Sequence, residues 1–282
     1  MRKQHRKLGI GFLAAVILCG LMVPEAAQAD IGIVNGLTHE RQSRTGETYE
    51  TFILVRNFGT EPASARIYQT DFYFSSDGQQ FYTDPGKLER SNAAWITFYP
   101  RQVTLAADET AEVRCEIKVP EEGNLRGTYW SLVMVEPLPE IPDEALTEEQ
   151  RKVQIGIKQI VRYGVQMITH IDDTGTREIK FLKTELLDEG EKKILEVDVE
   201  NIGERWLRPV LYVELFDDQA NHVGKFEAGQ LRIYPGTSVR YRVDLTSVST
   251  GRYKAMVIVD NKDEYVFGAE LTLDFSPMTS FR

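Results

Sequence analysis

Apolar residues recur at every second position through most of the chain after residue 30, and this alternation restricts the fold more than any other feature. One run has Val113, Cys115, Ile117 and Val119 separated by Arg114, Glu116 and Lys118, and another has Val239, Tyr241 and Val243. A period of two predicts strands with one buried face, and sustained helical periodicity is hard to find. Many short strands separated by turn signals predict a β-sandwich or barrel.

The chain also contains an internal repeat. Three matched blocks occur twice in the same order: Val55–Gly59 with Val199–Gly203, Tyr99-Pro100 with Tyr234-Pro235, and Gly127–Glu136 with Gly251–Asp260. Such a repeat predicts two copies of one structural module. The Asn-x-Gly turn after a strand and the Gly-x-Tyr start of a late strand are typical of immunoglobulin-like sandwiches. We therefore predict an all-β chain of two immunoglobulin-like domains, 30–171 and 172–282, divided at the polar turn that begins with Asp172.

Residues 1–29 have the layout of a secretory signal peptide. A basic cluster precedes an apolar run from Leu8 to Val23, and Ala27-Gln28-Ala29 offers small residues for cleavage before Asp30. The apolar run is shorter than the roughly 20 residues of a membrane-spanning helix. Cys19 follows Leu18, which is not the small residue that a lipoprotein signal places before its cysteine. We expect a periplasmic protein without a membrane anchor, with an extracellular or cell-surface location as the alternative.

Charge and motif content argue against several functions. The net charge of −10 opposes binding to nucleic acid or to anionic membranes. Cys115 is the one cysteine after the signal peptide, so neither an internal disulfide nor a cysteine metal site is expected. His39, His170 and His222 lack ligand-like spacing, and nucleophile and phosphate-binding motifs are missing. We predict no enzyme, catalytic residue, metal or cofactor, and we assign Cys115, Trp95 and Trp130 to the core.

The segment from Val153 to Ile171 is an unusually long alternating run. Its apolar odd positions are Val153, Ile155, Ile157, Val161, Tyr163, Val165, Met167 and Ile171. A single strand of this length would span about 60 Å at roughly 3.3 Å per residue, more than one sandwich can cover. Such a strand bends, continues into the second domain, or projects an edge beyond its own core. The alternative is that the odd positions simply face their own core.

The first domain resembles the periplasmic pilus-assembly chaperones. Gly127–Pro139 resembles their aromatic F strand with its terminal proline pair, and Ile155–Tyr163, after a proline- and acid-rich loop from Pro137 to Gln150, resembles their alternating G strand. Pro100 and the stretch from Val103 to Val119 extend the resemblance to about 110 residues. The resemblance implies two immunoglobulin-like domains in an L shape. It also implies that the G strand donates alternate apolar residues to the incomplete sandwich of a pilus subunit by β-augmentation.

The resemblance also implies site residues and partners. The candidate residues for binding a partner strand are Ile155, Ile157, Val161 and Tyr163, and the candidate anchors for a subunit's terminal carboxylate are Lys158 and Arg162. The family's first-strand arginine has no counterpart between Ile31 and Leu37. The expected partners are pilin-like or other exported protein subunits.

A second hypothesis is a non-catalytic adhesive or structural module of the cell envelope. The aromatic hairpin from Phe72 to Tyr82 would then be the contact for a polysaccharide or a surface protein. Glycan binding is expected under this hypothesis alone.

Overall fold

The computed structural model describes residues 31–139 and 160–275. The predicted signal peptide, most of the acid-rich loop, and the candidate residues Ile155, Ile157 and Lys158 lie outside the described residues. Almost every described element is a strand, and the two sandwiches formed by these strands confirm the predicted all-β fold class.

The first sandwich, called the first module below, contains all elements up to residue 171. These elements are β1 (Ile31–Ile33), β2 (Thr38–Ser43), β3 (Thr48–Asn57), β4 (Ala63–Phe74), β5 (Gln80–Thr83), the 3₁₀ turn η1 (Ala93–Trp95), β6 (Ile96–Tyr99), β7 (Gln102–Leu105), β8 (Thr110–Lys118), β9 (Gly127–Pro137) and β10 (Tyr163–Ile171). One sheet has the order β1-β3-β8-β6. The other has the order β2-β10-β9-β4-β5, with β7 also paired to β4.

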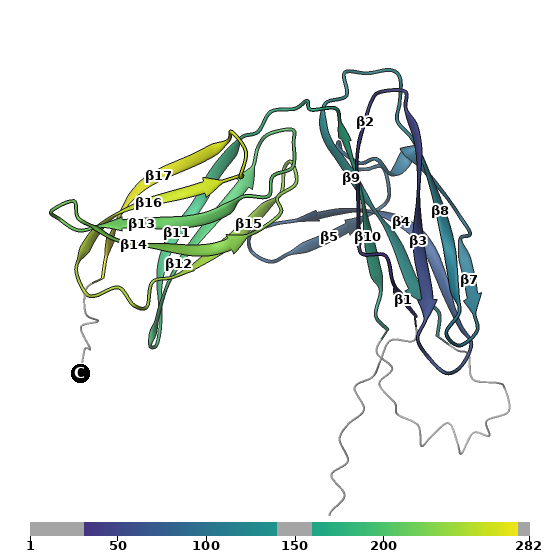
Figure 1. Ribbon diagram of the computed structural model, residues 1–282, viewed down its shortest axis with the longest axis horizontal. Helices are drawn as coiled ribbons and strands as arrows, with labels where there is room; N and C mark the ends of the chain where they lie inside the picture. The colour runs from purple at the N-terminus through teal and green to yellow at the C-terminus, as the bar shows by residue number, and fades with distance from the viewer. Residues whose placement is uncertain (1–30, 140–159, 276–282) are drawn as a thin grey trace, which may run out of the picture.

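The second sandwich, called the second module, repeats this plan with fewer strands. Its elements are β11 (Ile179–Glu189), β12 (Lys192–Asn201), β13 (Val210–Phe216), β14 (His222–Gln230), β15 (Ser238–Asp244), β16 (Arg252–Asp260) and β17 (Val266–Asp274). The sheets are β11-β12-β15 and β14-β13-β16-β17. The two modules meet at an angle, and the β4–β5 hairpin extends from the first module toward the second (Figure 1).

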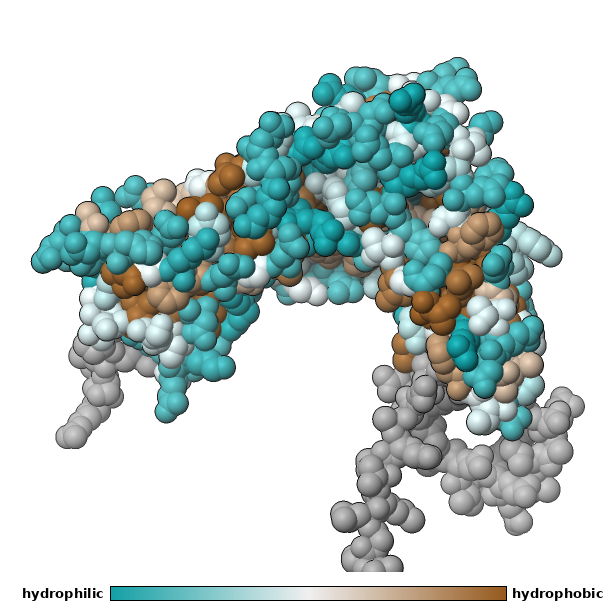
Figure 2. Space-filling view, viewed as in Figure 1, coloured by the Kyte–Doolittle hydropathy of each residue, from teal (hydrophilic) through white to brown (hydrophobic). Residues whose placement is uncertain are grey.

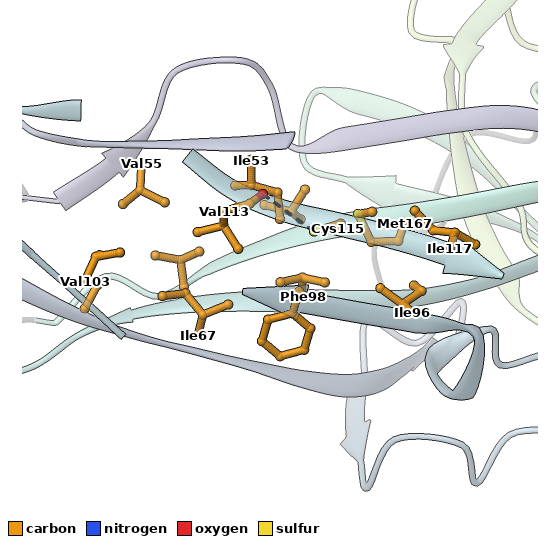
Figure 3. Close-up of a cluster of buried hydrophobic side chains, with 14 of the residues drawn as sticks. Ile53, Val55, Ile67, Ile96, Phe98, Val103, Val113, Cys115, Ile117 and Met167 are labelled. Atoms are coloured by element: carbon orange, nitrogen blue, oxygen red, sulfur yellow. Dashed lines mark hydrogen bonds between the residues drawn. The ribbon is translucent and has the colours of Figure 1, made fainter. Parts of the chain in front are cut away.

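The alternating residues fill the space between the sheets of each module. In β8, Val113, Cys115 and Ile117 are buried while the intervening charged residues are exposed. Figure 3 shows these side chains directed toward Ile67, Phe98 and Met167 of other strands. Cys115 is fully buried in this core, as predicted, and burial raises the pKa of its thiol to about 12.

The repeated Asn-x-Gly turn has the same structure in both modules. Asn57 and Asn201 are fully buried at the ends of β3 and β12. Each side-chain oxygen accepts a hydrogen bond of 2.9 Å from the glycine two residues later. Each side-chain amide donates across the module to main-chain oxygens, to Leu105 from Asn57 and to Ile233 from Asn201. The repeated asparagine therefore closes one turn and ties it to a distant strand connection.

These bonds generate a stability prediction. Asn57→Ala and Asn201→Ala should each lower the free energy of unfolding by about 2 kcal/mol, because buried main-chain oxygens lose their donor. Urea denaturation checks this, with the exposed turn residue Asn221 as the matched control in Asn221→Ala. If the three variants unfold at the same urea concentration, the buried amides do not hold the turns.

Candidate functional site

The first strand of the first module is divided between its two sheets. β1 pairs with β3 through the register Ile33↔Val55, and β2 pairs in parallel with β10 from Gln166↔Thr38 onward. Between them the chain crosses from one sheet to the other. The Val34 N–H donates to Leu54 O at 3.0 Å, whereas the Gln166 N–H donates to Leu37 O at 2.9 Å. Neither half-strand therefore covers the whole edge of its sheet.

The start of β10 consequently has a strand on one side only, among the described residues. β9 pairs with β10 along its entire length, from Tyr163↔Val135 to Ile171↔Gly127. β2 begins only at the level of Gln166. We call the space beside residues 160–165, in line with β2, the open lane.

The main chain of Gly164 points into this lane. The N–H groups of Gln166 and Asp172 both donate toward the β2 side. Since main-chain groups alternate in direction along a strand, even-numbered residues of β10 direct their N–H and C=O to that side. Gly164 therefore directs its N–H and C=O into the open lane, because β2 pairs with β10 only from Gln166 onward.

The structure places the sequence-predicted site residues in different surroundings. Tyr163 is half-buried against the first-module core, together with the buried Val165 and Met167, so the odd positions of β10 face their own core. Val161 is 39% exposed and precedes β10. Within the described residues the predicted long strand begins at Tyr163, because Ile160 to Arg162 form no strand.

Arg162 lies on the outer face of the sheet, not in the core. It hydrogen-bonds to Tyr68. Its positive charge also helps to lower the pKa of Glu136, which forms an ion pair with Arg66 at 2.9 Å. Burial raises the pKa of Tyr68, and its hydrogen bond with Glu136 raises it further, while Arg162 acts in the opposite direction. The hydrogen bond to Arg66 holds the pKa of Glu136 below its ordinary value. Arg162 thus belongs to a polar cluster beside the open lane.

The other half of this outer face forms the joint between the modules. Trp130 stacks on Tyr234 at 4.8 Å between ring centres, and Trp206 lies 5.9 Å from the same ring. Ile168 is buried in the same cluster, and Phe74 packs against it. The predicted burial of Trp130 in a core is confirmed, but its cluster lies between the modules and includes Trp206 and Tyr234 of the second module.

A buried polar network reinforces the joint around His170. Its Nδ1 lies 2.9 Å from Thr128 Oγ1, and its Nε2 lies 3.0 Å from Glu40 Oε1. The Thr128 hydroxyl also accepts the N–H of Trp206 at 3.0 Å, which links the two modules. Burial, followed by the positive charge of Arg205, lowers the pKa of His170 to about 4, while Glu40 opposes the shift. His170 is therefore neutral at pH 7.

Arg232 connects the second module to the end of the open lane. Its Nη1 donates to Gln166 Oε1 at 2.8 Å and to Thr38 Oγ1 at 3.2 Å, where β2 begins. Its guanidinium also covers the Trp206 ring at 4.6 Å. Sequence patterns gave no signal for Arg232, because it lies in a short connection outside any strand.

The space-filling view shows the hollow that the two modules enclose, with hydrophobic surface on the first module beside it (Figure 2).

The β4–β5 hairpin, predicted from Phe72 to Tyr82, is confirmed. Its tip touches the second module, where the Ser76 N–H donates to Ser238 Oγ at 2.9 Å. Phe72 packs on Tyr82 at 5.3 Å, and Tyr73 packs on Phe81 at 5.5 Å on the opposite face. Phe81 and Tyr82 remain 41% and 53% exposed. The hairpin therefore braces the joint and presents one aromatic residue on each face.

In the described ranges 31–139 and 160–275, no group of histidine, cysteine, aspartate or glutamate residues could hold a metal ion. The described part of the chain also has no helix with the length and apolar character needed to cross a membrane.

Comparison with known proteins found similarity at the level of solved structures. No protein-family model matches the chain, and no curated protein matches its sequence. The chain is similar to the class 5 fimbriae chaperone CfaA, at 13% identity and a TM-score of 0.45, covering 88% of this chain and 100% of that one. It is also similar to the E. coli chaperone DraB, at 14% identity and a TM-score of 0.39, covering 86% and 98%. A third is the Pseudomonas aeruginosa CupB2 chaperone, at 13% identity and a TM-score of 0.37, covering 85% and 99%. At such identities and TM-scores these are similarities only.

The buried His170 predicts a pH dependence of stability. A histidine whose pKa is lower in the folded than in the unfolded protein contributes stability above about pH 6.5, and that contribution is lost as the pH falls toward 4. Wild type should lose more stability between pH 7 and pH 4.5 than His170→Gln, as measured by urea denaturation. His222→Gln, in which an exposed histidine is replaced, should behave as wild type. Equal pH dependence in wild type and His170→Gln would contradict the buried neutral state.

Proposed function

We propose that the protein is an exported chaperone-like protein that binds a strand of a partner protein by β-augmentation. The binding site is the open lane beside β10, and the partner is a pilin-like or other exported subunit. The function requires no catalysis, because attachment comes from main-chain hydrogen bonds and from alternating side-chain contacts. The protein would act in the periplasm after removal of residues 1–29, with domains at 30–171 and 172–282.

The observation that carries the proposal is the early end of the β2–β10 pairing. A sheet edge offers a row of main-chain donors and acceptors to any strand that aligns with it. Here the sheet continues from Gln166 to Tyr163, whereas β2 starts only at Thr38, level with Gln166. A partner strand placed in line with β2 would extend the existing ladder without moving it.

Exposed apolar side chains surround the lane and indicate an apolar partner. Leu37 is 44% exposed and Phe58 is 41% exposed. A Cβ atom on Gly32 would lie 2.8 Å from the Phe58 ring and 3.7 Å from the Tyr163 hydroxyl, so these groups meet beside the lane. Val161 adds a third exposed apolar residue. Exposed apolar side chains near an unpaired strand edge favour a protein partner.

The rigid joint supports the same function. The aromatic cluster of Trp130, Trp206 and Tyr234 fixes the second module on the face next to the lane. Arg232 of the second module hydrogen-bonds to Gln166, which is the first residue of β10 that pairs with β2. The second module would therefore form one wall of the hollow that receives the partner.

Site-specific photocrosslinking tests the proposal in the living cell envelope. A benzoylphenylalanine at Val161 should yield discrete adducts with exported proteins, whereas one at Val266, a well-exposed residue of β17, should not. Gly164→Pro should abolish the adducts, because it removes the N–H that faces the lane and leaves the β9 ladder intact.

Gly164→Ala is the matched control. It adds the same Cβ atom but keeps the N–H, so the adducts should persist. Circular dichroism and urea denaturation establish that both variants are folded. Adducts of equal yield from both folded variants would contradict main-chain pairing at this edge.

A further inference from the structure

Gly164 is the second residue of β10 and lies opposite Met134 of β9. Glycine weakens a strand, and its presence there often marks a place where another group approaches closely. Its backbone does not require glycine, since Gly164 is not among the residues with positive φ. A Cβ atom there would lie 3.1 Å from Leu132 Cδ1 and 3.3 Å from Met134 Sδ, so these two side chains would have to shift by a few tenths of an ångström. The side chains of Leu132 and Met134 therefore occupy part of the space that a side chain at position 164 would fill.

A groove of about 370 Å³ opens over this position. It is lined by Tyr68, Thr70, Tyr82, Met134, Arg162 and Gly164. Met134 supplies an apolar, largely buried side chain to the lining, while Thr70 and Arg162 supply polar groups, and one wall is the Tyr82 ring, which is 53% exposed. The hydrogen bond from Arg162 to Tyr68 and the packing of Tyr82 on Phe72 hold the walls in place.

Two residues that line the groove, Arg162 and Gly164, also border the open lane. Side chains of an added strand alternate between the two faces of the sheet, so some of them stand on the outer face next to Gly164. Met134 belongs to β9, which lies two strand spacings, about 10 Å, from the lane. A side chain that leans over Gly164 reaches Met134 only if it is large.

We propose that this groove is the specificity pocket of the site and takes a large apolar or aromatic side chain of the partner strand. The inference rests on the proposed function, because the side chain is delivered by the strand in the lane. Aromatic rings suit the pocket best, since methionine sulfur, tyrosine rings and the guanidinium of Arg162 all make favourable contacts with them.

Synthetic peptides test the pocket. The probes are four blocked nonapeptides of alternating threonine and valine whose central residue is alanine, leucine, phenylalanine or lysine. Binding to the full chain without its first 29 residues is followed by NMR, through the amide of Gly164 and the methyl group of Met134. The phenylalanine peptide should bind about tenfold more tightly than the alanine peptide, a difference of about 1.4 kcal/mol.

Two neighbouring residues of β5 supply the matched variants. Tyr82→Ala should remove the advantage of phenylalanine over alanine, because Tyr82 lines the groove. Phe81→Ala should keep it, because Phe81 packs on Tyr73 on the opposite face of the hairpin. Both residues are exposed on the same edge strand, so neither change should unfold the protein.

The outcomes separate the pocket from the proposed function. Equal affinity of the four peptides, with a shift of the Gly164 amide in each titration, overturns the pocket and leaves strand addition standing. Peptides that never shift the Gly164 amide overturn both. A sugar probe such as methyl mannoside that shifts the Met134 methyl group, where the phenylalanine peptide does not, assigns the groove to glycans and overturns the pocket as well.

Discussion

The division of the first strand between two sheets determines where the first module has an unpaired sheet edge among its described residues. Buried main-chain groups need partners, and a strand that stays in one sheet would cover that sheet's edge completely. Here β1 belongs to one sheet and β2 to the other, and in the described part of the chain the crossing at residues 34–37 leaves the open lane beside the start of β10. The apolar core survives this break, because Ile31 and Val165 remain fully buried on either side of it.

A single sheet face then carries two tasks. At one end, Trp130 and Ile168 are buried against Trp206 and Tyr234 of the second module. At the other end, Gly164 leaves a groove beside the lane. Because the joint is aromatic, stacked and tied by buried hydrogen bonds, the second module is held at a fixed position relative to the lane. The hollow between the modules (Figure 2) follows from this arrangement.

Local sequence signals predicted the fold well, because period-two alternation and the Asn57 and Asn201 turns depend on near neighbours along the chain. The joint between the modules was not predicted from the sequence, and the reason is physical. An outward-facing Trp130 in an apolar strand has the same pattern as a core residue, and the matched positions Tyr99 and Tyr234 differ completely, being 77% and 1% exposed. The groove escaped because its defining residue, Gly164, has no side chain. The division of the first strand is indicated in the sequence by the Asn35-Gly36 pair, a turn signal between two short alternating runs.

Amide hydrogen exchange at Gly164 shows whether the open lane is free in the unbound protein. In the free protein the N–H of Gln166 is bonded to Leu37 and that of Val165 faces β9, so both should exchange slowly. The N–H of Gly164 faces the lane and should exchange at least about a hundredfold faster, a local difference of about 2.8 kcal/mol. Protection of Gly164 equal to that of Gln166 would mean that the open lane is already filled within the same molecule and that no partner strand can pair there.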